Sequence, residues 1–121
     1  MFHYLAKIKI LKQLKLDFYM IYNKLVRDKV PQIIKEKGKI PKTHIADEKE
    51  YWDKLKIKLR EEVDEFIKDN NKDEMADIFE VITAINSLKG WNIEEIIKTQ
   101  KKKRKERGGF RDKIILDEVK E

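Results

Sequence analysis

The stretch LREEVDEFIKDNNKDEMADIFEVI, residues 59–82, decides the fold of this chain because it joins the end of one helical pattern to the start of another. On both sides of DNNK, apolar residues recur every three or four positions, which is the spacing of an amphipathic helix. Both patterns also carry carboxylates inside their apolar arcs, where a solvated helix surface would not place them. Glu62 lies between Leu59 and Phe66 on the first helix, and Glu74 lies within a widened apolar arc of the second.

The inward face of each helix follows from its apolar residues, because successive residues of a helix lie about 100° apart. The first helix has one apolar stripe, formed by Trp52, Leu55, Leu59, Val63 and Phe66. The main stripe of the second helix is formed by Met75, Ile78, Phe79, Ile82 and Ile85, and Val81 and Leu88 widen it. We expect these stripes to be the buried faces of the two helices.

Capping residues outside this stretch give the helix boundaries. Asp47, followed three residues later by Glu50, resembles a capping box, and Asn92 with Glu95 repeats the pattern. Glycines predict the helix ends, because they readily adopt the left-handed conformation that closes a helix. The expected elements are a short helix at 31–37 closed by Gly38, a long helix at about 48–68, a second long helix capped by Asn71 or Asp73 and ending at Lys89 before Gly90, and a third helix to about Arg107 before Gly108 and Gly109.

These elements predict an all-α protein, a helical bundle built on two long antiparallel helices plus a third helix. The final apolar segment FRDKIILDEV, residues 110–119, is interpreted as either a strand-like arm or a docking tail. Two helices cannot cover their own apolar faces well. We therefore expect the bundle to be completed by oligomerisation, most simply as a dimer with twofold symmetry.

Length and composition set the broad class of the protein. The 121 residues fit one domain, which we place at 21–121 after a basic N-terminal extension, 1–20. This extension can be read as an amphipathic helix for a membrane or a partner, a helix packed on the domain, or a segment upstream of a start at Met20. The chain has no cysteine and only His3 and His44, which excludes disulfides and Cys-ligated zinc and argues against a histidine-based metal site.

The charge and hydropathy of the chain bear on its partners and its location. The net charge of +6 points to an anionic partner, or simply to solubility. No apolar run approaches the roughly 20 residues of a membrane helix, so no membrane is expected as a partner. The N-terminal residues lack the apolar core of a signal peptide, and we expect a cytoplasmic protein.

Four acidic residues form two pairs with i, i+3 spacing on either side of the short turn: Glu62 with Glu65, and Glu74 with Asp77. Antiparallel packing of the two helices would bring the pairs together. Clustered carboxylates in a poorly solvated place repel one another and lose hydration, and a divalent cation removes both problems. Oxygen ligands without histidine or cysteine favour Mg²⁺ or Mn²⁺ over Zn²⁺.

The same acids also have an ordinary structural interpretation. Asp73 and Glu74 lie in the first turn of a helix, where the helix dipole stabilises acids in any case. Glu61 and Glu65 can form surface ion pairs with nearby basic residues, namely Lys58, Arg60 and Lys68. The basic run KTQKKKRKERGGF, residues 98–110, can bind phosphates or nucleic acid, or can be a solvated helix end.

EEVDEF followed by DEMADIFEVI resembles the paired ExxE and ExxD motifs of the all-α nucleoside triphosphate pyrophosphohydrolases, the MazG-like superfamily. That superfamily includes phosphoribosyl-ATP pyrophosphohydrolase and the dimeric dUTPases. Together with YNKLVRDKVPQII, EYWDKLKIKLREEVDEF and KERGGF, these blocks resemble a MazG-related branch of predicted house-cleaning pyrophosphohydrolases. The resemblance covers roughly residues 22–119.

The resemblance implies a Mg²⁺-dependent hydrolysis of a nucleoside triphosphate to a nucleoside monophosphate and pyrophosphate. By motif position, the metal ligands would be Glu62, Glu65, Glu74 and Asp77, and the catalytic residues Glu61 and Glu62. Glu61 is the candidate for orienting the attacking water. Candidates for binding substrate phosphates are Lys24, Arg27, Lys29, Lys103, Arg104 and Arg107. In the alternative interpretation, Arg27 or Asp28 forms an ion pair that fastens the N-terminal segment to the bundle.

The expected partners are a nucleoside triphosphate and further copies of the chain, as a homodimer or homotetramer. Tyr51, Trp52 and Trp91 could stack on a base, or belong to the core. Two rival functions are a helical module that binds nucleic acid through the basic third helix, and a non-catalytic oligomerisation protein. Nucleic acid is not the partner we expect, because such a module gives no reason for Glu62 to lie in an apolar stripe. No P-loop, G-x-S-x-G elbow or Cys/His pair supports another catalytic class.

Overall fold

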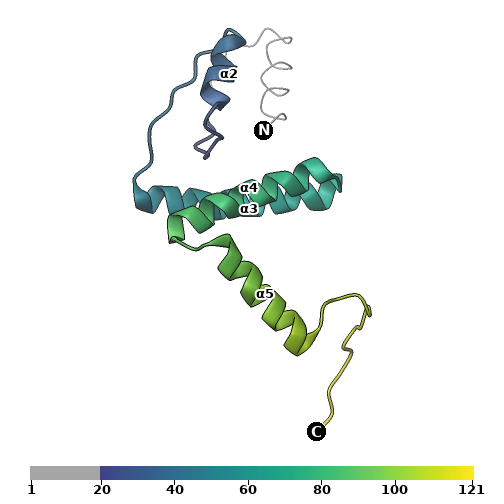
Figure 1. The fold of residues 1–121 in the computed structure, drawn as a ribbon. Coiled ribbons are helices and arrows are strands. Elements are labelled where there is room, and N and C mark those ends of the chain that lie inside the picture. Colours follow the sequence, from purple (N-terminus) through teal and green to yellow (C-terminus); the bar gives the residue numbers. More distant parts are fainter. Residues whose placement is uncertain (1–19) are drawn as a thin grey trace. The chain divides into compact units, whose positions relative to one another are not determined.

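The computed structural model describes residues 20–121, so the expectation for the N-terminal extension, 1–20, lies almost wholly outside this part of the chain. The described residues form helices and no strand (Figure 1). The helices are α2 (Val30–Glu36), α3 (Glu48–Asp69), α4 (Lys72–Lys89) and α5 (Ile93–Arg107). The all-α prediction is confirmed, and the helix ends that the sequence indicated agree to within about one residue. Residues 110–121 form neither helix nor strand, so the strand-like arm is not observed.

Side-chain caps explain why the three longer helices begin where they do. Asp47 accepts a hydrogen bond from the backbone N–H of Glu50 at 2.8 Å. Asn71, rather than Asp73, caps α4 by accepting from the Glu74 N–H at 2.9 Å. Asn92 starts α5 in the same way. Each such cap typically stabilises a helix by about 1 kcal/mol.

The connection between α3 and α4 consists of only Asn70 and Asn71. Asn70 has a φ of 54°, in the left-handed region, and its N–H donates to the Phe66 carbonyl. Asparagine tolerates this conformation better than most residues, because its short polar side chain can bond locally. The turn is therefore tight, and α4 begins close to the last turns of α3.

The chain divides into two compact units, one ending at Ile82 and the other spanning Thr83–Glu121, with α4 contributing to both. In the first unit α2 packs against α3. The buried apolar residues of the described chain are Val30, Leu55 and Val81, which all belong to this unit. The second unit contains α5, which has no buried residue. No described helix combines the length and apolar character needed to cross a bilayer.

The buried face of α4 in the first unit differs from the face that the sequence indicated. Phe79 is 64% exposed and Met75 and Ile82 are each 37% exposed, whereas Val81 is buried. The main stripe predicted for α4 is thus largely open, and the side carrying Val81 and Glu74 is the inward one. The physical reason is that α4 is turned to bring its acids to Glu62 of α3, which leaves the Phe79 side roughly a third of a turn away.

Candidate metal centre

Acidic side chains of α3 and α4 come together beside the turn that joins these helices. Oxygen atoms of Glu62, Glu74 and Asp77 all lie within 4.8 Å of one another. Glu65, Asp69 and Glu74 form a second group with the same spacing, so Glu74 belongs to both groups. The structure therefore brings the four acids that the sequence singled out together in the first unit, and it adds Asp69.

Glu62 is the most buried of these acids. Only 3% of its surface is exposed, as its position inside the apolar stripe of α3 led us to expect. Its charge is balanced within the same helix, because Lys58 Nζ lies 3.2 Å from Glu62 Oε1. A buried carboxylate needs such a partner, since transfer of an isolated charge out of water is strongly unfavourable.

Lys58 is a residue whose place the sequence analysis missed. The structural interpretation of the acids offered it as a surface partner of Glu61 or Glu65, but its side chain is only 12% exposed. It lies one helical turn before Glu62 and also 3.7 Å from Glu61 Oε1. The spacing of Lys58 and Glu62 in the sequence could have indicated this pair, because residues four apart share a helix face. The same rule applies to Asp69, which lies four residues after Glu65.

The N-terminal segment that precedes α2 reaches the same acids. Arg27 Nη2 lies 2.6 Å from Asp77 Oδ1, and Lys24 Nζ lies 3.2 Å from Glu61 Oε2. Lys54 of α3 fastens the segment by donating a hydrogen bond to the Asn23 carbonyl at 2.6 Å. Two of the predicted phosphate-binding residues, Lys24 and Arg27, are thus already at the acids of the site. The fastening ion pair that we proposed as the alternative for Arg27 is present.

The other predicted phosphate-binding residues belong to the start of α2 and to α5. Lys29 is exposed and occupies the N-cap position of α2. The remaining three are exposed on α5, in the second unit. These three basic residues lie on the same face of α5 as the isoleucines near its start. This face therefore changes from apolar to basic along the length of the helix. That face is formed by Ile93, Ile96, Ile97, Lys103, Arg104 and Arg107.

Burial and the crowding of like charges both affect the titration of Glu74. Its pKa is raised above the ordinary value of 4.5, first because burial disfavours the charged form and then because other acids repel it. Those acids are Asp77, Asp69, Glu62 and Glu65. A bound cation would favour the charged form of Glu74 and so offset the effects of burial and of the neighbouring acids.

The donor set fits a hard divalent cation. Carboxylate oxygens are the ligands that Mg²⁺ and Mn²⁺ prefer. Mg²⁺ holds its ligands at about 2.1 Å, so oxygens on opposite sides of the ion are about 4.2 Å apart. The oxygens of Glu62, Glu74 and Asp77, within 4.8 Å of one another, need only small movements to meet at one ion.

The raised pKa of Glu74 leads to a prediction for the metal-free protein. The folded state keeps its proton to a higher pH than the unfolded state, so stability falls as pH rises from about 4.5 through the raised pKa. Glu74→Gln should remove this loss. Its unfolding free energy in urea, relative to wild type, should therefore increase from below pH 4.5 to neutral pH. Parallel curves for Glu74→Gln and wild type would contradict this prediction.

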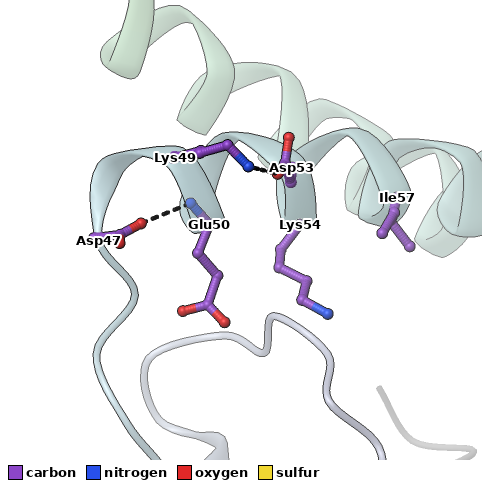
Figure 2. A pocket seen from close by; sticks show the side chains of 6 residues that line it. All are labelled: Asp47, Lys49, Glu50, Asp53, Lys54 and Ile57. Atoms are coloured by element: carbon purple, nitrogen blue, oxygen red, sulfur yellow. Dashed lines mark hydrogen bonds and ion pairs between the residues drawn. The ribbon is translucent and has the colours of Figure 1, made fainter.

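A separate hollow of about 550 Å³ lies along the first turns of α3 (Figure 2). None of its lining residues is one of the site acids, and each charged one already has a partner. Asp47 caps the helix, Lys49 pairs with Asp53 at 3.4 Å, and Glu50 Oε1 lies 2.8 Å from His44 Nε2. Lys54 holds the Asn23 carbonyl. This hollow therefore offers little to a charged ligand.

The aromatic candidates for base stacking are spread over both units. Tyr51 and Trp52 are half-buried on α3, and Lys56 Nζ lies 5.1 Å from the centroid of the Trp52 ring. Trp91 is exposed in the second unit, where its backbone N–H donates to the backbone carbonyl of the buried Asn86 at 2.9 Å.

Comparison with known proteins adds no relative. The chain matches no protein-family model, and no curated protein or solved structure gives a significant match. A function for this chain therefore has to be argued from the geometry of the first unit and from its motifs.

Proposed function

We propose that this protein is a Mg²⁺-dependent nucleoside triphosphate pyrophosphohydrolase, which converts a nucleoside triphosphate and water to a nucleoside monophosphate and pyrophosphate. The observation that carries the proposal is the meeting of acids from α3 and α4, with the buried Glu62 among them. The resemblance of the paired motifs to the MazG-like enzymes supports the same reaction. The role of the protein in the cell would be the removal of unwanted nucleotides.

Glu62, Glu65, Glu74 and Asp77 would hold the ion. When bound, Mg²⁺ or Mn²⁺ would acidify a coordinated water and offset negative charge on the phosphate oxygens. Glu61, next to Glu62, is the candidate to orient the attacking water and accept its proton. The oxygen of that water would bond to the α-phosphorus, and the bond from this phosphorus to the bridging oxygen would break. Pyrophosphate would leave.

Arg27 and Lys24 are suited to bind phosphate because they sit at the site on a non-helical segment. In the described structure they neutralise Asp77 and Glu61. Once a cation has taken over that role, their charges would be available for substrate oxygens. Arginine in particular can grip a phosphate with two parallel hydrogen bonds. Lys29 and the basic face of α5 remain further candidates for phosphate contacts.

The proposal includes an antiparallel pairing of α3 and α4 and self-association as a homodimer or homotetramer. The tight turn at Asn70 supports the pairing. The sparse core supports association, because Met75, Phe79 and Ile82 form an open apolar side on α4 that another copy could cover. Association through a twofold axis would pair this side with itself.

Replacing Phe79 with Glu should disrupt this association. A buried aromatic residue at the centre of an interface commonly contributes about 2 kcal/mol or more, so the dissociation constant should rise by at least about 30-fold. Sedimentation should give a multiple of 14.6 kDa for wild type and a shift toward 14.6 kDa for the variant. Glu80→Gln, at the next exposed position, should associate normally. A wild-type chain that sediments as a monomer at all concentrations tested would refute the expected assembly.

The proposed reaction is tested by incubating normal and modified nucleoside triphosphates with the protein and Mg²⁺. Chromatography should detect the nucleoside monophosphate and pyrophosphate in equal amounts, and a chelator should stop their formation. Glu62→Gln serves as the inactive control. Orthophosphate with a nucleoside diphosphate would show cleavage of a different bond, and no product from any substrate would argue against the enzyme.

A second candidate, nucleic-acid binding, is favoured by one observation. α5 is rich in lysine and arginine and has no buried residue, so its charges are open to an anionic polymer. Binding of this kind should weaken steeply as salt rises, because bound phosphates release counterions. It leaves the buried Glu62 and its neighbouring acids without a role, so we rank it second.

A further inference from the structure

The ion pair between Lys58 and Glu62 differs from the other intrahelical pairs of α3. Lys49 and Lys56 both pair with Asp53, but their side chains are 89% and 51% exposed. Lys58 is 12% exposed, and its partner Glu62 is almost completely buried. Surface pairs contribute little to stability, and their arrangement needs no special cause. The enclosure of Lys58, in contrast, needs a physical explanation.

Helix stability alone does not account for this arrangement. An ammonium loses much hydration when it is enclosed, and an intrahelical pair is more favourable when the acid precedes the base. Here Lys58 precedes Glu62, in the less favourable order. The position is explained if Lys58 balances charge at the acids, because Glu62 also approaches Glu74 and Asp77. Arg27 of the N-terminal segment balances the charge of Asp77 in the same way.

We propose that Lys58 is a further substrate-binding residue, which balances Glu62 while no cation is bound and binds a phosphate oxygen once a cation is present. This inference rests on the proposed function. A divalent cation at Glu62 would repel the ammonium at short range. The flexible four-carbon stem of lysine allows the ammonium to move away from Glu62. With Glu62 and Asp77 bound to the cation, Lys58 and Arg27 would lose the carboxylate partners that they have in the described structure, and phosphate oxygens would replace these partners.

Two effects of Lys58→Met follow, and they have opposite signs. Methionine keeps an unbranched apolar stem but removes the competing charge, so Mg²⁺ or Mn²⁺ alone should bind about tenfold more tightly or better. Inorganic pyrophosphate in saturating Mg²⁺ should bind about tenfold more weakly or worse, because a cation has been lost from its site. Lys58→Arg keeps the charge and should stay near wild type in both measurements.

Titration calorimetry of the full chain, first with Mn²⁺ and then with pyrophosphate at saturating Mg²⁺, tests the proposal. Lys56→Met, which removes an exposed partner of Asp53, is the matched control and should change neither affinity. Lys58→Gln is the second variant if Lys58→Met does not fold. A merely structural Lys58 would weaken cation binding when replaced, so unchanged or weaker Mn²⁺ binding in the folded variant overturns the proposal. Unchanged affinity of the folded variant for pyrophosphate also overturns the proposal.

The outcome for Lys58 can be separated from the outcome for the enzyme. If wild type hydrolyses nucleotides but the Lys58 variants bind Mn²⁺ no more tightly, the reaction stands and this role of Lys58 is wrong. If wild type binds Mn²⁺ and pyrophosphate with the expected Lys58 effects but hydrolyses no nucleotide, the reaction is wrong and the role of Lys58 stands. If wild type binds no divalent cation, both fall.

Discussion

Glu62→Gln is expected to lower nucleoside triphosphate turnover by about three orders of magnitude or more, a loss typical for groups that stabilise charge in a transition state. Glu62 is the most buried of the acids that come together between α3 and α4, and it approaches acids from α4 as well as Lys58. Glutamine has nearly the same shape but no negative charge, so it is a poor ligand for Mg²⁺. The measurement is the steady-state rate of pyrophosphate release at saturating Mg²⁺.

Asp64→Asn is the matched control for this substitution. Asp64 lies on the same helix between Glu62 and Glu65 but is exposed, and it is not among the acids that come together. It should therefore retain nearly full turnover. A Glu62→Gln variant that folds and retains wild-type turnover would show that the acids have no catalytic part.

Mg²⁺ is expected to raise the melting temperature of the wild-type protein by about 10 °C when present at 100 times its dissociation constant. Binding to the folded state alone at that concentration stabilises it by about 2.7 kcal/mol. In a small domain 1 kcal/mol corresponds to about 4 °C or more. Asp77→Asn should lose most of this rise, because it removes one of the acids whose oxygens lie close enough together to share an ion.

Thermal unfolding with Mg²⁺, with a chelator and with NaCl of equal ionic strength separates specific binding from salt screening. Asp64→Asn should show the full rise with Mg²⁺. An equal rise with NaCl, or a rise that persists in Asp77→Asn, would place the effect of Mg²⁺ outside these acids.

Local features of the sequence were sufficient to predict the helices. Asp47, Asn71 and Asn92 cap their helices through hydrogen bonds to backbone N–H groups two or three residues ahead. Such contacts are encoded within a few residues, so the boundaries could be identified without tertiary information. The burial of Glu62 was also predictable, because its neighbours on α3 fix its direction.

Contacts between segments could not be predicted in the same way. Arg27 and Asp77 are 50 residues apart in the chain, and only the packing of the N-terminal segment brings them together. Periodicity also failed to select between the two apolar sides of α4, because both are plausible faces until a neighbour is known. The open side at Phe79 shows which of them the first unit does not cover.

The central claim is that acids of α3 and α4 share one divalent cation, and a crystal structure with Mn²⁺ tests it most directly. An anomalous difference map should show a peak bonded to oxygens of Glu62, Glu74 and Asp77 at about 2.1 to 2.2 Å, with Lys58 displaced from Glu62. A map without a peak at these acids, with Lys58 and Arg27 still paired to Glu62 and Asp77 at saturating Mn²⁺, would contradict it.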